Sequence, residues 1–237
     1  MVYSKRVDSR KFDQPREIEA RVGIIKRADG SAYFKIGKTI AIAAVYGPRE
    51  LYPAFKQNPE TGILRCNYDM MSFSVTERKK PGPTRRSVEI SLVTENALLP
   101  ALDLSLFPNT VIDVFIQIIQ ADAGTRCAGI SAAAMALADA GIPMKDLVSS
   151  ISVGKVGDKI VLDLNKEEED YEEGSTDIPV AIMPRNGEIS LLQLDGDVEK
   201  EELLQALKLA KKGCDEIYKI QRQALKERYG GSAQDEL

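Results

Sequence analysis

The chain has 237 residues, of which 43% are hydrophobic and 29% charged, and its formal net charge is −4. This composition predicts a globular protein with a substantial core, and no apolar run approaches the roughly 20 residues that a membrane-spanning helix needs. The absence of histidine excludes Ser-His-Asp and Cys-His catalysis, histidine general bases and most zinc sites. Any catalysis must therefore use carboxylates, Lys or Arg, hydroxyls, backbone dipoles or a hard cation such as Mg²⁺.

The first residues and the cysteines indicate a cytoplasmic protein that does not associate with membranes. Residues 1–16 are polar and charged, so we expect no secretory signal. The three cysteines, Cys66, Cys127 and Cys214, are widely spaced and odd in number. Such spacing favours reduced thiols over a disulfide framework or a cysteine metal site.

In chain order, the N-terminal part first predicts three strands joined by hairpin-type turns. The strands cover residues 18–26, 32–36 and 39–46, and Gly47-Pro48-Arg49 ends the third. A loop rich in Pro and Asn then leads to another predicted strand at 67–75. A basic loop, 76–83, follows it.

Two helices and a buried strand are predicted next. Thr84 is placed to cap a helix that runs to about residue 99, with Val88, Leu92 and Leu99 along one face. The apolar run 111–119 predicts a buried strand. An alanine-rich helix at 126–140 follows it.

The second half repeats this order in outline. Strands are predicted near 148–153, 159–164, 179–183 and 189–194, and a long helix at 199–228. The amphipathic stripe of this helix favours packing on its own sheet, although a coiled-coil or partner-binding face is the alternative. We therefore expect one α+β layered domain spanning residues 1–237, with a frayed tail at about 230–237.

The junction between the buried strand and the alanine-rich helix is a candidate anion site. Gly124 allows close backbone approach, Thr125 adds a hydroxyl, and Arg126 adds a guanidinium suited to phosphate oxygens. Helix starts carry free N–H groups and partial positive charge. The alternative is a tight turn into a helix whose small residues permit close packing.

A basic segment precedes the first predicted helix. Arg78, Lys79 and Lys80 read equally as a solvated loop or as a nucleic-acid contact. Arg85 and Arg86 are different, because a cation in the first turn of a helix is disfavoured by about 0.3–1 kcal/mol. Glu89 could offset part of this cost by pairing with one of them. Two such arginines indicate an anion site that would suit a phosphodiester backbone.

An acidic run, 167–173, precedes an apolar strand that begins just after Asp177. A carboxylate at the mouth of a buried strand suits a metal ligand or a proton carrier, and it suits a turn cap equally well. Asp170, seven residues earlier, could supply a second carboxylate. Together with the candidate anion site at residues 124–126, which we call the anion seat, these groups would suit phosphoryl transfer.

Three motifs in order carry a family resemblance: Arg85-Arg86-Ser87-Val88-Glu89-Ile90, Ala121-Asp122-Ala123-Gly124-Thr125-Arg126 and Asp177-Ile178-Pro179. With them, residues 5–229 resemble the RNase PH family. Within it, Tyr46-Gly47-Pro48-Arg49-Glu50 is most similar to the catalytic RNase PH-like subunit of the archaeal exosome. The resemblance implies an RNase PH-like α+β fold with two βαβα-like halves.

The resemblance also implies an activity. Inorganic phosphate would attack the last 3′ linkage of single-stranded RNA and release a nucleoside diphosphate, and the reverse reaction would tail RNA. By position, Gly124, Thr125 and Arg126 would hold the phosphate, and Arg85 and Arg86 would hold the RNA 3′ end. Asp177 would be the catalytic carboxylate and would ligate Mg²⁺ or assist protonation of the leaving oxygen. Arg65 would guide the incoming strand.

One position departs from the family pattern. The family's second acidic residue lies six positions before the catalytic one, where this chain has Tyr171, so Asp170 or Glu172 is expected to take its role. The resemblance further implies a hexameric ring that alternates with an inactive RNase PH-like paralogue and carries RNA-binding cap proteins. The alternatives are a homohexameric RNase PH that trims tRNA 3′ ends and a non-catalytic RNA-binding ring subunit.

Overall fold

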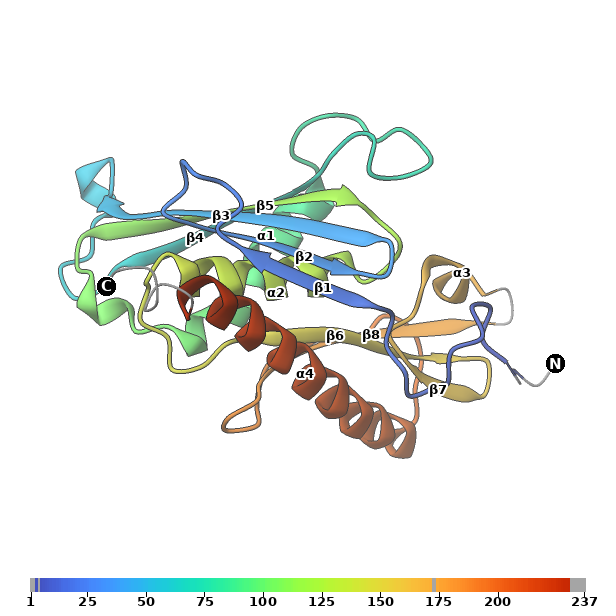
Figure 1. The fold of residues 1–237 in the computed structure, drawn as a ribbon. Coiled ribbons are helices and arrows are strands. Elements are labelled where there is room, and N and C mark those ends of the chain that lie inside the picture. The colour runs from blue at the N-terminus through green and yellow to red at the C-terminus, as the bar shows by residue number, and fades with distance from the viewer. Residues whose placement is uncertain (1–2, 4, 172–173, 231–237) are drawn as a thin grey trace.

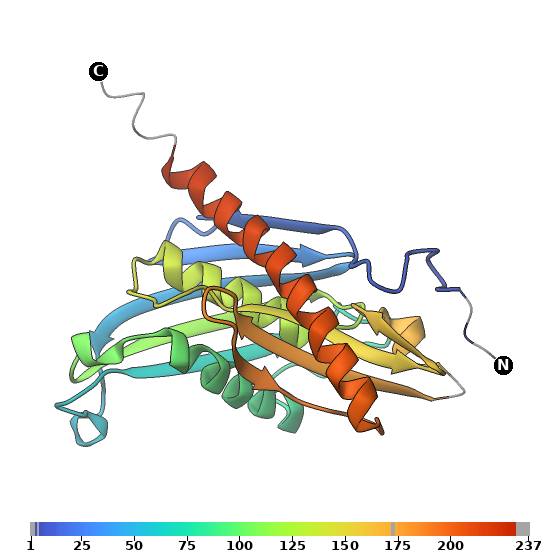
Figure 2. The same ribbon diagram turned by 90° about the horizontal axis from the view of Figure 1, so that it is seen from below.

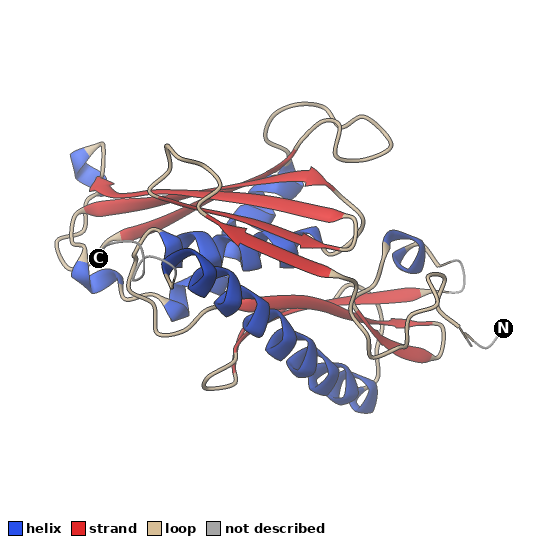
Figure 3. Cartoon of the chain, viewed as in Figure 1, coloured by secondary structure: helices blue, strands red, loops and turns tan. Residues whose placement is uncertain are grey.

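Two β-sheets enclose a layer of three helices in the computed structural model, which describes residues 3, 5–171 and 174–230 (Figure 1). The first sheet has the strand order β1-β2-β3-β5-β4, and the second has the order β7-β6-β8-β9. Figure 3 shows the two sheets in red on either side of the helices. The first sheet consists of β1 (Ile18–Val22), β2 (Gly30–Ile36), β3 (Thr39–Glu50), β4 (Ile63–Met70) and β5 (Thr110–Gln120), and the second of β6 (Ser149–Val156), β7 (Lys159–Leu162), β8 (Ser175–Met183) and β9 (Glu188–Leu192).

Helix α2 (Thr125–Asp139) lies in the middle of the helical layer. It packs on β2 and β3 of one sheet and on β6 of the other, and 13 of its 15 residues are buried. This burial on all sides explains its run of alanines, because only small side chains let two sheets approach one helix. Helix α1 (Arg85–Leu98) packs on β4, and α4 (Lys200–Tyr229) on β1, β6 and β7. Figure 2 shows α4 crossing the molecule diagonally.

The order of elements confirms most of the sequence predictions. Strands β4 and β5 are parallel and joined through α1, whereas all other pairs are antiparallel. The stripe of α4 packs on the protein's own sheets, so the coiled-coil alternative is not needed to explain it. Cys66, Cys127 and Cys214 are free, as expected, and all three are buried. Among the described helices, none is long and apolar enough to cross a membrane.

Three predictions about elements were wrong. Gly47-Pro48-Arg49 does not end the third strand, because β3 continues to Glu50 through a bulge against β5. The strand predicted at 67–75 is β4 at Ile63–Met70. Val88 and Leu92 are 61% and 57% exposed, because α1 buries the face with Ile90, Thr94 and Ala97 instead.

A short helix in the second half was not predicted. Helix α3 (Lys166–Glu169) is capped by Asn165, whose side chain accepts a hydrogen bond from the Glu168 amide. The Glu168 carboxylate in turn accepts a hydrogen bond from the Asn165 amide. This reciprocal pair is a capping box, which marks the start of a helix. It was missed because Glu168 belongs to the acidic run at residues 167–173. The frayed tail predicted from about residue 230 falls largely on 231–237, which lie outside the described residues.

Candidate active site

The turn that starts α2 has the shape of an anion seat. Gly124 is the N-cap residue with φ 62°, and Ala123 before it has φ 60°. No side chain caps this end of the helix, so its first N–H groups remain available to a ligand. Thr125 opens the helix, and the Arg126 side chain extends from the first turn, where it donates a hydrogen bond to Oε1 of Gln193.

The buried Tyr68 hydroxyl lies beside this seat. Burial raises the pKa of Tyr68 to about 12, and the opposing influences come from Thr125, Arg86 and Arg126. Among the described residues, none satisfies the distance and angle of a hydrogen bond to this hydroxyl. Tyr68 therefore marks the point where the first turns of α1 and α2 converge. Its alternation with Leu64 and Cys66 puts it on the buried face of β4, but no sequence signal indicated that its hydroxyl meets the two helix starts.

Asp177 lies near the seat, on β8. Its carboxylate accepts a hydrogen bond from the Ser152 hydroxyl of β6. Burial raises the pKa of Asp177, and the charge of Asp195 adds to this effect, while Ser152 and Arg126 oppose it. The structure thus brings Asp177 within electrostatic reach of Arg126. A carboxyl group with a raised pKa is suited to carrying a proton.

Glu169, at the end of α3, is the carboxylate that interacts with Asp177. Burial, with the negative charge of Asp177 as a second cause, raises the pKa of Glu169 to about 7, while Lys166 and Arg86 oppose this shift. Asp170 has a different environment, because its side chain is 62% exposed and forms an ion pair with Lys166 at 2.6 Å. Glu172, the other expected candidate, lies outside the described residues. Sequence reasoning missed Glu169 because it sits within a run of acidic residues.

The two arginines of α1 occupy its first turn, as predicted. Thr84 caps the helix, its hydroxyl accepting a hydrogen bond from the Ser87 amide at 3.1 Å. Arg85 and Arg86 are both exposed, and the charge of Arg86 acts on Tyr68 and on Glu169. Arg86 therefore belongs to the same site as Arg126.

Glu89 pairs differently from the sequence expectation. Its carboxylate lies 3.9 Å from Nη1 of Arg126 and accepts a hydrogen bond from Nε2 of Gln193. The expected pairing with Arg85 or Arg86 is not what the structure has. Glu89 and Gln193 instead hold the Arg126 guanidinium between α1 and the segment after β9.

The structure does not bring Arg65 into this group. Arg65 lies on β4 between the buried residues Leu64 and Cys66, so its side chain points to the outer face of the sheet. There it donates two hydrogen bonds to Asp113 of β5, at 2.5 and 2.9 Å. Tyr68 and the anion seat are on the opposite face.

The fit of a divalent cation depends on Asp177 and Glu169. No group of three His, Cys, Asp or Glu side chains gathers in a metal-binding arrangement within the described part of the chain. Mg²⁺, however, is commonly held by one or two carboxylates together with substrate phosphates. The negative charge of Asp177 raises the proton affinity of Glu169, so these two partly buried carboxylates fit that mode, because a cation between them would relieve their repulsion.

Comparisons of the sequence with known proteins agree on one family. The first domain of the 3′ exoribonuclease family matches residues 14–143, and the second domain of that family matches residues 146–213. Exosome complex component Rrp41 of Thermococcus gammatolerans is 57% identical over 231 residues, covering 98% of this chain and 92% of that protein.

Comparisons of the structure confirm the RNase PH-like α+β fold. Rice Rrp46 has a TM-score of 0.83 and 26% identity, covering 93% of this chain and 100% of that one. A structure of the Archaeoglobus fulgidus exosome with RNA bound to the active site has a TM-score of 0.76 and 23% identity. It covers 90% of this chain and 91% of that one.

Proposed function

The chain belongs to the 3′ exoribonuclease family, and from this premise we propose that it is the phosphate-dependent 3′-to-5′ exoribonuclease subunit of an archaeal exosome. One observation supports the proposal most: Arg86, Arg126 and the carboxylates Asp177 and Glu169 interact around one helix start. Phosphorolysis requires positively charged groups that bind two phosphates, and beside them groups that can carry a proton.

The reaction assigns a role to each group. Inorganic phosphate binds at Gly124 and Thr125 with Arg126, and the RNA 3′ end binds at Arg85 and Arg86. An oxygen of inorganic phosphate forms a bond to the terminal phosphorus, and the bond from that phosphorus to the 3′ oxygen of the preceding nucleotide breaks. The products are a nucleoside diphosphate and an RNA that is one nucleotide shorter and ends in a 3′ hydroxyl.

Asp177 is the catalytic carboxylate and has one of two roles. It assists protonation of the leaving 3′ oxygen, which the upward direction of its pKa favours, or it ligates Mg²⁺ in its ionised form. In the second role, Mg²⁺ held by Asp177 and Glu169 would neutralise charge on the phosphate oxygens. In this assignment Glu169 takes the place of the second carboxylate expected at Asp170 or Glu172. Without a cation its proton affinity keeps it partly neutral near pH 7.

Exposed apolar side chains support an assembly. Val88 and Leu92 of α1 are more than half exposed, and Leu192 of β9 and Leu194 after it are 46% and 45% exposed. Helix α1 packs beside β9, so these side chains lie on neighbouring elements. Apolar side chains gathered on neighbouring surface elements are typical of a protein interface. We propose a ring that alternates with an inactive paralogue and carries RNA-binding cap proteins.

The experiment follows the degradation of end-labelled single-stranded RNA with Mg²⁺, with and without inorganic phosphate, and identifies the released nucleotide. It uses the chain alone and the chain co-purified with its ring partner. We expect phosphate-dependent release of nucleoside diphosphates. Asp177→Asn should lower turnover by about 10²- to 10⁴-fold while leaving RNA binding largely intact. Asp215→Asn, the same change on α4, is the matched control.

Each result selects one function. Activity only with the partner supports the exosome subunit, and activity of the chain alone supports the homohexameric enzyme. Release of nucleoside monophosphates regardless of phosphate contradicts phosphorolysis. RNA binding without release in either preparation supports the non-catalytic ring subunit. Loss of RNA binding in proportion to activity in Asp177→Asn contradicts its catalytic role.

A further inference from the structure

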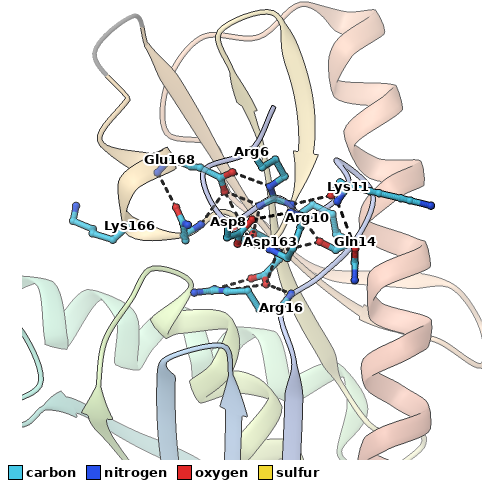
Figure 4. A network of polar contacts seen from close by, with 12 residues as sticks. Arg6, Asp8, Arg10, Lys11, Gln14, Arg16, Asp163, Lys166 and Glu168 are labelled. Atoms are coloured by element: carbon cyan, nitrogen blue, oxygen red, sulfur yellow. Dashed lines mark hydrogen bonds and ion pairs between the residues drawn. The ribbon is translucent and has the colours of Figure 1, made fainter. Parts of the chain in front are cut away.

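The segment before β1 is attached to the second half of the chain by buried arginines (Figure 4). Arg6 is 1% exposed and donates two hydrogen bonds to the Glu168 carboxylate of α3, at 2.8 and 2.6 Å. Arg16, 7% exposed, donates two to the Asp163 carboxylate, at 2.8 and 2.7 Å. Both arginines thus hold the loop that leads from β7 into α3.

Arg16 differs from Arg6 because it also contacts the turn that starts α2. Its Nη1 donates a hydrogen bond to the carbonyl oxygen of Asp122 and lies 3.7 Å from the Asp122 carboxylate. The other oxygen of that carboxylate accepts a hydrogen bond from the Lys166 amide, at 3.2 Å. Arg16, Asp122 and Asp163 therefore connect the anion seat to the start of α3.

The seat has a backbone that needs such support. Ala123 and Gly124 both have positive φ, and for a residue with a side chain this conformation is costly unless its surroundings impose it. Thr39 holds the turn from one side, its hydroxyl donating to the Ala123 carbonyl at 2.7 Å and accepting from the Asp122 amide at 2.9 Å. Arg16 contacts the same turn at Gly124, because a Cβ on Gly124 would be 3.3 Å from Nη2 of Arg16.

The charge on Arg16 also acts on the carboxylate side of the site. Burial alone would lower the pKa of Arg16, but Asp163, Asp122 and Glu169 outweigh this and keep its pKa above the ordinary value. The Arg16 guanidinium is therefore charged at neutral pH. It interacts with Glu169 and with the turn at residues 122–124.

We propose that Arg16 is a positioning residue for phosphate: it holds the turn at residues 122–124 against α3, so that the anion seat and the acidic helix keep one relative position. The inference rests on the proposed function, because it takes inorganic phosphate as the ligand of the seat. Arg16 itself does not need to touch the substrate. Lysine cannot replace it, since one ammonium group cannot bind Asp163 with two parallel bonds and also reach the Asp122 carbonyl.

The test compares Arg16→Lys with the wild-type chain in two measurements, using the full chain with whatever partner its activity requires. The first is the increase in melting temperature caused by inorganic phosphate, and the second is the KM for phosphate and for RNA. We expect the KM for phosphate to rise about tenfold, which corresponds to about 1.4 kcal/mol, while the KM for RNA stays unchanged. The phosphate-induced increase in melting temperature should shrink accordingly.

Two further variants separate positioning from general stability. Asp163→Asn leaves Arg16 in place and suits the left-handed backbone at this position (φ 56°), so it should fold and shift the phosphate KM in the same direction. Gln221→Met removes buried hydrogen bonds to the Val148 carbonyl and to the Ser131 carbonyl, which lies about two turns along α2 from the seat. It should lower the melting temperature without changing the phosphate KM.

The outcomes distinguish this inference from the proposed function. If Arg16→Lys and Asp163→Asn keep the wild-type affinity for phosphate and lose only melting temperature, the positioning role is wrong. If wild-type chain degrades RNA without phosphate, the proposed function fails. The melting-temperature measurement still decides in that case: a smaller phosphate-induced increase in Arg16→Lys supports the inference, and no increase in the wild-type chain overturns it.

Discussion

Glu169 shows how a single side chain couples stability to pH. Its pKa is raised to about 7, first by burial and then by the charge of Asp177. In the unfolded chain the pKa of a glutamate is about 4.3. Between these two values the folded protein binds more protons than the unfolded one, so the free energy of unfolding falls as pH rises through this window.

Glu169→Gln should remove this dependence, because the amide does not ionise. We expect the melting temperature of the wild-type chain to fall more than that of the variant between about pH 5 and about pH 8 in metal-free buffer. Glu167→Gln, an exposed position on the same helix, is the control and should follow the wild type. An equal fall in melting temperature over this pH range for Glu169→Gln and wild type would contradict the coupling.

The first turn of α1 sets two cations at the positive end of a helix dipole. Arg85 and Arg86 are exposed there, and the helix is capped by Thr84 rather than by an acidic residue. Such a turn attracts phosphates through charge alone. The logarithm of the binding constant falls linearly with the logarithm of the salt concentration, and each phosphate neutralised on single-stranded nucleic acid contributes about 0.7 to this slope.

Arg85→Glu combined with Arg86→Glu should therefore weaken RNA binding and flatten that slope by roughly 1.4. The measurement is the RNA dissociation constant over a series of salt concentrations. Lys208→Glu combined with Lys211→Glu makes the same charge change on the exposed side of α4 and should alter the slope much less. An unchanged slope in the α1 variant would mean that its two arginines are structural.

The same elements show which features the sequence could predict. The Thr84 cap, the glycine turn at Gly124 and the apolar run of β5 are local patterns, and all three were predicted. The buried side of α1 was not, because a three-layer fold decides which face meets β4. Glu169 was missed for a similar reason, since its environment depends on Asp177 and Arg86, which are distant in sequence. Local sequence patterns thus predicted the helices and strands and the anion seat. Packing between segments distant in sequence decided which face of α1 is buried and how strongly Glu169 binds a proton.

The whole molecule depends on how closely two sheets approach one central helix. At its C-terminal end α2 contacts the backbone of β2, where the Asp139 carboxylate accepts a hydrogen bond from the Ser31 amide at 2.8 Å. A Cβ on Gly30 would lie 2.2 Å from the Ala140 nitrogen and 2.3 Å from the Ala136 carbonyl oxygen. These atoms belong to backbone, so neither layer can yield by a change of side-chain rotamer.

Gly30→Ala should therefore force β2 and α2 apart and destabilise the fold by about 1–3 kcal/mol, as overpacking generally does. For a chain of this size each kcal/mol corresponds to roughly 2–4 °C in melting temperature. Gly129→Ala is the matched control within α2, because its added methyl group meets the side chains of Ile116 and Tyr68 at 3.2 and 3.5 Å. Those side chains can adjust, and alanine favours a helix over glycine by about 0.5–1 kcal/mol, so the net change should be near zero. Thermal unfolding of both variants measures the difference, and equal losses would mean that the spacing of the layers is not set at Gly30.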